Sequence, residues 1–371
     1  MQFPKTRAYI DGLIESKGLP YIDVCAWQDH TPIFRHSYSA EGVVTGKEPL
    51  FLYSATKPIT VACAMRLVEE GKLGLDEPLY KYVPAYAHAR VKTSDGGTKP
   101  LEEPILIRHL FTMSAGLDYN LGMPAILDLK KQNPLAGTVD FVNAFVSEPL
   151  QFPAGERFLY SLCHDVLGAV VEVVSGKRFA DYARDTVFAP LGMPNTGFHL
   201  EDTREIARQY MATQTGEIQE MDRINPFVFT RNYDSGGAGA VGCVDDYIRF
   251  ADALACGGVG ENGYRLLQEE TVQKIREVQV QGVSFQNSFT CVQGDEYGYG
   301  LGVRVRKKPT AWGLDAGEFG WDGAAGTYLL IDPVKHISVV VGMHLRNWPV
   351  LFRGEHLRIT ERLYTDFFGK N

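Results

Sequence analysis

A serine and a lysine stand three residues apart in PLFLYSATKPIT, residues 49–60, a segment otherwise made mostly of apolar or small side chains. If a helix begins at Ser54, this spacing places Lys57 on the same face one turn later. The helix N-terminus favours an oxyanion at the serine, and apolar surroundings disfavour the ammonium form of the lysine. The pair is therefore suited to act as a nucleophile and its proton acceptor. The alternative is that Ser54 only caps the helix and Lys57 extends to solvent.

The elements that must hold this pair follow from the patterning of the chain. Alternating, β-branched and aromatic residues over 20–53 predict strands. Residues 54–70 have the pattern of a helix, and Gly71 is well placed to end it. From about residue 76 to 225 the pattern is mainly helical, with breaks marked by proline and glycine.

Strand-like runs return in the C-terminal third, and the chain ends on an amphipathic helix, EHLRITERLYTDFF. Strands at both ends with helices between them predict one α/β domain interrupted by a helical one. We expect residues 1–80 and 226–371 to form the sheet domain and residues 81–225 to form the helical domain. The active site would then lie in the cleft between the two.

Composition argues against several classes of partner. The formal net charge is −8, and no run of basic residues marks a nucleic-acid surface. No apolar run approaches membrane-spanning length, and residues 1–20 lack the apolar core of a signal peptide. The six cysteines are scattered without a CxxC pair, which is typical of reduced thiols in a cytoplasmic protein. The nine histidines include no HExxH motif, so we expect no metal site.

Cofactor and hydrolase motifs of other folds are also missing. Residues 237–242 fit GxGxxG, but no strand-like run precedes them, so we interpret them as a glycine-rich turn near the active-site rim. The chain contains no P-loop and no GxSxG nucleophile elbow. We therefore expect no cofactor.

Five stretches in order resemble the serine β-lactamase and penicillin-binding-protein superfamily, above all the class C β-lactamases and their esterase relatives. These stretches are YSATKPIT with LVEEGKLGLDEPLYKYVP, ILIRHLFTMSAGL, PAGERFLYSLCHDVLGAVVEVVSG, SGGAGAVGCVDDYIRFADAL and FGWDGAAGTYLLIDP. The resemblance implies an α/β (α+β) fold of the β-lactamase/DD-peptidase type. Such a fold has an antiparallel sheet flanked by helices and an inserted, mainly helical domain.

The resemblance assigns roles to three side chains. Ser54 would be the acylated nucleophile and Lys57 its proton partner. Tyr160, in the stretch YSL, matches the tyrosine of the family's second motif and would exchange a proton with the serine or the leaving group. A rival tyrosine, Tyr233 in RNYDSGG, is a candidate for the substrate-binding wall.

The third motif departs from that of the β-lactamases, because the chain has no K-T-G or K-S-G. The matching stretch is Trp321-Asp322-Gly323, similar to the motif of the family's esterases. Gly323 would let substrate approach the strand, and the Ala324 and Ser54 N–H groups would form the oxyanion hole. We expect Trp321 to face the pocket and Asp322 to pair with an arginine. The alternative is that Asp322 faces the substrate and favours amines.

The second motif departs as well. Leu162 stands where the family usually has an asparagine that contacts the substrate. His164 lies four residues after Tyr160 and is a candidate for substrate contact, although a helix cap or a core histidine is the favoured interpretation. Asp165 fits a charge at a helix N-terminus better than a catalytic group.

These features predict a serine hydrolase that forms an acyl-enzyme on Ser54 and acts on a small-molecule ester, amide or lactam. An esterase for small or aromatic acyl groups is favoured, because the motif lacks the lysine that holds a carboxylate. Three alternatives remain: a β-lactamase or D-amino-acid peptidase or amidase, an acyltransferase, and a binding protein that kept the fold without turnover. No nucleic-acid or membrane partner is expected, and the oligomeric state is left open.

Overall fold

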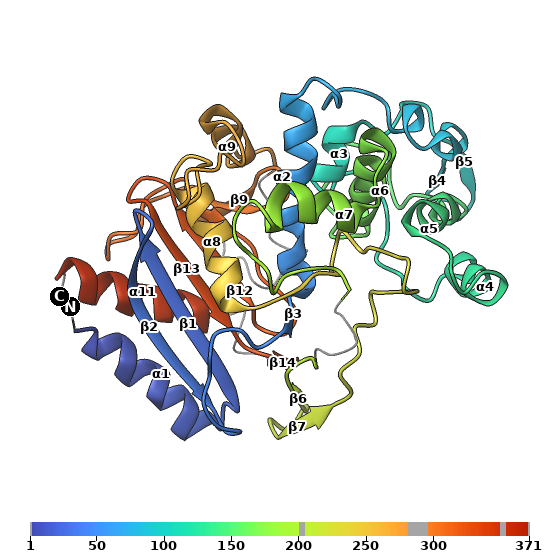
Figure 1. Ribbon diagram of the computed structural model, residues 1–371. Helices are drawn as coiled ribbons and strands as arrows, with labels where there is room; N and C mark the ends of the chain where they lie inside the picture. Colours follow the sequence, from blue (N-terminus) through green and yellow to red (C-terminus); the bar gives the residue numbers. More distant parts are fainter. Residues whose placement is uncertain (1, 200–204, 281–295, 349–353, 370–371) are drawn as a thin grey trace.

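A seven-stranded antiparallel sheet forms the centre of the computed structural model, which describes residues 2–199, 205–280, 296–348 and 354–369 (Figure 1). The strands, in sheet order, are β2 (Thr31–Ser39), β1 (Tyr21–Gln28), β13 (Ile337–Gly342), β12 (Tyr328–Asp332), β11 (Phe319–Gly320), β10 (Arg304–Arg306) and β9 (Tyr297–Tyr299). The N-terminal strand β1 pairs with β13 from Asp23↔Gly342 to Gln28↔Ile337. The expected sheet shared by both ends of the chain is confirmed.

Helices cover both faces of this sheet. The terminal helices α1 (Pro4–Lys17) and α11 (Glu355–Phe368) pack together on one face, and α8 (Val244–Ala255) crosses the other (Figure 1). Alternate residues of β13 point to opposite faces of the sheet. Val339 packs with the terminal helices, and Val340 packs in the core that contains α8. Because both faces are buried, β13 is apolar along most of its length, with Ser338 as its one polar residue.

The helical part of the molecule lies beside this sheet, beyond the central helix α2 (Thr56–Glu69) (Figure 1). Its elements are α3 (Ile107–Phe111), α4 (Pro124–Gln132), α5 (Thr138–Phe145), α6 (Cys163–Ser175) and α7 (Phe179–Ala183). Two small hairpins lie in the same stretch of sequence: β4 (Arg90–Lys92) with β5 (Thr98–Pro100), and β6 (Gln209–Ala212) with β7 (Ile218–Met221). The predicted domain borders at residues 80 and 225 stay a prediction.

The nucleophile segment differs in detail from the expected helix over 54–70. Ser54 lies in a 3₁₀ turn, Tyr53–Ala55, that is reached from the short strand β3 (Leu50–Phe51) and runs directly into α2. Tyr53 has a left-handed φ of 47°, an unusual conformation for a bulky residue. This sharp turn presents the serine at the start of α2, and α2 ends just before Gly71, as the sequence predicts.

None of the helices in the described ranges combines the length and apolar character that a bilayer crossing needs.

Candidate active site

Ser54 receives two side-chain hydrogen bonds at the start of α2. The Lys57 Nζ donates to Ser54 Oγ at 3.2 Å, and the Tyr160 hydroxyl donates to the same oxygen at 2.6 Å. Tyr160 comes from the loop before α6, so two elements distant in sequence converge on one hydroxyl. Both Ser54 and Tyr160 are partly exposed, as a reacting pair must be.

Lys57 is fully buried. Its Nζ also donates to the carbonyl oxygen of Gly237 at 2.7 Å, and no ion pair with a carboxylate is formed within the described residues. Burial lowers the pKa of Lys57 to about 7, and the charge of Asp165 opposes this only in part. Near neutral pH a large fraction of the amine is therefore uncharged and able to accept a proton from Ser54.

Aromatic rings fix the position of Tyr160. Its ring stacks on Tyr119 with centroids 5.5 Å apart and on Trp321 with centroids 5.8 Å apart. The Trp321 Nε1–H points to the Tyr160 hydroxyl oxygen at 3.4 Å, and Lys57 Nζ lies 4.6 Å from the ring centroid. The Trp321 N–H favours negative charge on the Tyr160 oxygen when a proton leaves it. The protonated form of Lys57 has the same effect.

The turn after Trp321 approaches the nucleophile closely. A Cβ on Gly323 would come within 2.3 Å of the Leu52 carbonyl oxygen, so this position requires glycine. The Gly323 N–H donates to Thr327 and the Gly326 N–H donates to Gly323. The N–H of Ala324, partly exposed between them, has no acceptor among the described residues. It is therefore available to a ligand, as an oxyanion-hole donor must be.

The glycine-rich segment after β7 lines the inner side of the site. Side chains at Gly236 and Gly237 would meet the His164 carbonyl at 2.3 Å and the Asp165 carboxylate at 2.4 Å. The backbone can therefore lie directly against the start of α6 and offer the Gly237 carbonyl to Lys57. The sequence predicted a glycine-rich turn near the active site but not this contact.

The family model described as Beta-lactamase matches residues 6–363 of the chain. The chain belongs to the β-lactamase family. Esterase EstB of Burkholderia gladioli is 31% identical over 315 residues, which cover 78% of this chain and 76% of that protein. The lovastatin esterase of Penicillium rubens is 33% identical over 157 residues, 40% of this chain and 39% of that protein.

A solved structure described as EstCE1, a hydrolase with promiscuous acyltransferase activity, superposes with a TM-score of 0.80 and 25% identity. The alignment covers 97% of this chain and 98% of EstCE1. The expected superfamily and the α/β fold of the β-lactamase/DD-peptidase type are thus confirmed.

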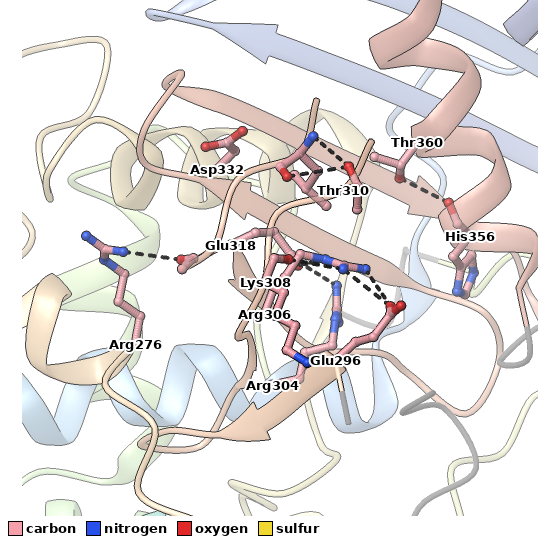
Figure 2. Close-up of polar contacts among 12 residues, drawn as sticks. Arg276, Glu296, Arg304, Arg306, Lys308, Thr310, Glu318, Asp332, His356 and Thr360 are labelled. Carbon is pink, nitrogen blue, oxygen red and sulfur yellow. Dashed lines mark hydrogen bonds and ion pairs between the residues drawn. The ribbon is translucent and has the colours of Figure 1, made fainter. Parts of the chain in front are cut away.

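Asp322, the middle residue of the third family motif, is buried behind the strand. Arg304 Nη1 donates to Asp322 Oδ1 at 3.1 Å, so the expected arginine partner is present. The same guanidinium donates to Glu318 at 3.3 Å and to the Leu329 carbonyl at 2.8 Å. Figure 2 shows Arg304 beside Glu318, within a polar cluster that also contains Arg306 and Glu296. The alternative in which Asp322 faces the substrate is not what the structure shows.

Trp321 is fully buried, between Tyr160 and Tyr299. In the described structure its ring therefore supports Tyr160 instead of lining an open pocket. A direct contact between Trp321 and substrate stays a prediction.

One substrate-binding candidate, Tyr233, is placed wrongly by the sequence, whereas His164 lies in the core, as its favoured interpretation expects. Tyr233 is fully buried, and its hydroxyl donates to Asp165 Oδ1 at 2.8 Å, so it does not form a substrate wall. Its turn points inward because the buried Asp165 needs donors, and Ser235 Oγ supplies another at 2.5 Å. His164 is fully buried too, and burial lowers its pKa well below the ordinary value.

Leu162 immediately precedes α6 and is buried. Its side chain lines a small cavity of about 110 Å³ with Leu117, Met123 and Phe145. Its contact with substrate stays a prediction. Tyr119, which stacks on Tyr160, was not predicted. It lies two residues after ILIRHLFTMSAGL, one of the stretches that carry the family resemblance, and this proximity was the available signal.

Proposed function

We propose that the protein is a carboxylesterase that hydrolyses small or aromatic acyl esters through an acyl-enzyme on Ser54. The observation that carries the proposal is the convergence of a buried lysine and a tyrosine on one serine oxygen, at 3.2 and 2.6 Å. Family membership and the esterase relatives support a hydrolase. The roles of the individual residues belong to the proposal.

In the first half-reaction, the neutral Lys57 amine accepts the proton of Ser54 as the serine oxygen attacks the ester carbonyl. The Ala324 and Ser54 N–H groups stabilise the oxyanion of the tetrahedral intermediate. The alkoxide leaves as the Tyr160 hydroxyl protonates it, and the proton held by Lys57 restores Tyr160. Water then attacks the acyl group, with the same two residues acting in reverse.

The charges around the site favour an ester over a β-lactam or a peptide terminus, since both of those carry a carboxylate. The strand beside the oxyanion hole has Trp321 and Asp322 in place of a lysine motif. Arg304, the cation behind this strand, already pairs with Asp322 and Glu318. A substrate carboxylate would therefore find no compensating charge from this strand.

Intact-mass spectrometry after exposure to a fluorophosphonate, and separately to a penicillin, tests the proposal. We expect one stable fluorophosphonate adduct, located on Ser54, and no penicillin adduct. Ser54→Ala should lose both the adduct and hydrolysis of a p-nitrophenyl ester, while the exposed Ser147→Ala control keeps them. Full activity in Ser54→Ala would refute the nucleophile, and rapid acylation by penicillin would refute the ester preference.

Acyl transfer is a second candidate, because the structure titled EstCE1 is described as having promiscuous acyltransferase activity and covers nearly the whole chain. An added alcohol would replace water in the second half-reaction at the same residues. Product analysis with acceptor alcohols separates the two outcomes: a new ester indicates transfer, and free acid alone indicates hydrolysis.

A further inference from the structure

Side chains of types that can bind metals gather at one end of the sheet, where two hairpin turns meet the C-terminal end of helix α8. Asp29 and His30 form the two-residue turn between β1 and β2. His336 lies in the turn between β12 and β13, and its carbonyl accepts the Asp29 N–H at 3.1 Å. Asp252 and Cys256 lie one helical turn apart at the C-terminal end of α8. The cluster thus joins segments more than 200 residues apart in the chain.

Three ligand atoms in this cluster are close enough to share one ion. A ring nitrogen of His30, a carboxylate oxygen of Asp252 and the Cys256 Sγ all lie within 4.8 Å of one another. The same sulfur lies within 4.8 Å of ligand atoms of Asp29 and His336. Neighbouring ligands of a tetrahedral Zn²⁺ stand about 3.3–3.8 Å apart. The contacts of the sulfur would need to close by at most about 1 Å, and the His30 and Asp252 atoms, now 2.6 Å apart, would need to open by about 0.7 Å.

The three side chains are already held in place. Asp252 is fully buried, and its two oxygens bind the His30 backbone N–H at 3.2 Å and the His30 Nδ1 at 2.6 Å. The Cys256 thiol points to the same carboxylate at 3.9 Å. Asp29 and His30 both have left-handed φ values, 46° and 63°, which is the geometry of a type I′ hairpin turn. The turn fixes where the imidazole points.

We propose that His30, Asp252 and Cys256 form a binding site for Zn²⁺ or a similar borderline transition-metal ion. A sulfur, an imidazole and a carboxylate together suit Zn²⁺, whereas Mg²⁺ and Ca²⁺ prefer oxygen ligands alone. Asp29 and His336, joined at 2.7 Å, lie near the same sulfur and can supply a fourth ligand or orient one. Binding releases the thiol proton of Cys256.

The ion would join the end of α8 to two hairpin turns. At its other end, α8 reaches the nucleophile segment, where the Tyr247 hydroxyl donates to the Ala55 carbonyl at 2.5 Å. None of the three ligands is part of the catalytic arrangement proposed above, so the site would stabilise the fold without taking part in ester hydrolysis.

The test is metal binding by the full chain after removal of metals with EDTA. Titration of Zn²⁺ in competition with a chromogenic chelator should show one site per chain. His30→Ala and Cys256→Ser should each weaken binding at least about a hundredfold. Cys243→Ser, at the opposite end of α8, and the exposed His88→Ala are matched controls and should bind as wild type does. Unchanged binding in Cys256→Ser would overturn the proposal.

A second measurement needs no variant. Co²⁺ bound through Cys256 should give a thiolate-to-metal charge-transfer band in the near ultraviolet, which excess Zn²⁺ removes and excess Mg²⁺ does not. Zn²⁺ should also raise the melting temperature of wild type and leave that of Cys256→Ser unchanged. Absence of the Co²⁺ band in wild-type protein would overturn the proposal independently of whether any variant folds.

Discussion

Replacing Lys57 by methionine should abolish ester hydrolysis and at the same time make the fold more stable near neutral pH. The amine is fully buried, and burial lowers its pKa from 10.5 to about 7. In the unfolded chain it titrates at its ordinary value. Between pH 7 and 10.5 the unfolded state therefore binds more protons, and the stability of the fold rises with pH. The buried amine costs about 4 kcal/mol of unfolding free energy at pH 7 and about 2 kcal/mol at pH 9.

Methionine fills a similar volume and removes this cost at every pH. It also leaves the buried Gly237 carbonyl without its donor, a loss of about 1–3 kcal/mol that does not depend on pH. We therefore expect Lys57→Met to be more stable than wild type by on the order of 1–3 kcal/mol at pH 7. The advantage should shrink by about 2 kcal/mol at pH 9.

Urea unfolding at pH 7 and pH 9, followed by tryptophan fluorescence, measures this difference. Lys130→Met, on the exposed side of α4, is the control and should stay within about 0.5 kcal/mol of wild type at both values. A stability difference between Lys57→Met and wild type that is the same at pH 7 and pH 9 would refute the depressed pKa. It would also remove the physical basis for a neutral amine as the proton acceptor.

The remaining predictions concern catalysis. Because only the neutral amine accepts a proton and its pKa is about 7, kcat/KM for an uncharged ester should rise about tenfold from pH 6 to pH 8; a flat profile would contradict this. Tyr160→Phe should lower kcat at least about a hundredfold, whereas Tyr233→Phe should mainly cost about 1–3 kcal/mol of stability; the reverse pattern in ester assays and urea unfolding would exchange their roles. Gly323→Ala should lower kcat about a hundredfold by pushing the turn from the Leu52 carbonyl, whereas Gly12→Ala, with open space around it, should not; equal activities would contradict the close approach.

The convergence of Ser54, Lys57 and Tyr160 could be predicted from sequence, but on two different grounds. Ser54 and Lys57 share one helical turn, so local geometry alone brings them together. Tyr160 needed the family resemblance, since nothing local links it to residue 54. The pairing of Asp322 with an arginine was predictable from strand alternation and from the cost of an unpaired buried carboxylate. The sequence did not indicate that Arg304 is the arginine that supplies this pair.

Contacts between loops that are distant in the sequence could not be predicted, because no sequence pattern marks them. The Gly237 carbonyl binds Lys57 across 180 residues, and Tyr119 stacks on Tyr160 from a separate loop. Tyr233 was misassigned because a tyrosine just before a glycine-rich turn is expected at the surface. In the structure its hydroxyl instead donates to the buried Asp165 carboxylate. In the proposed metal site only Asp252 and Cys256 are close in sequence, and His30 comes from a distant hairpin turn, so no complete ligand motif appears in the sequence.

The hydrogen bond from Tyr233 to Asp165 affects the charge state of Lys57, and thereby its proposed role as a base. This carboxylate is fully buried and close enough to Lys57 to raise its pKa, but Oδ1 accepts the hydroxyls of Tyr233 and Ser235. Lys57 instead donates to the neutral Gly237 carbonyl, which positions the amine without fixing its charge. A direct ion pair with Asp165 would favour the ammonium form and leave Ser54 without a proton acceptor at neutral pH. The two hydroxyl donors therefore satisfy Oδ1 of Asp165 without such a pair, and burial keeps the lysine pKa low enough for the role of base that we propose.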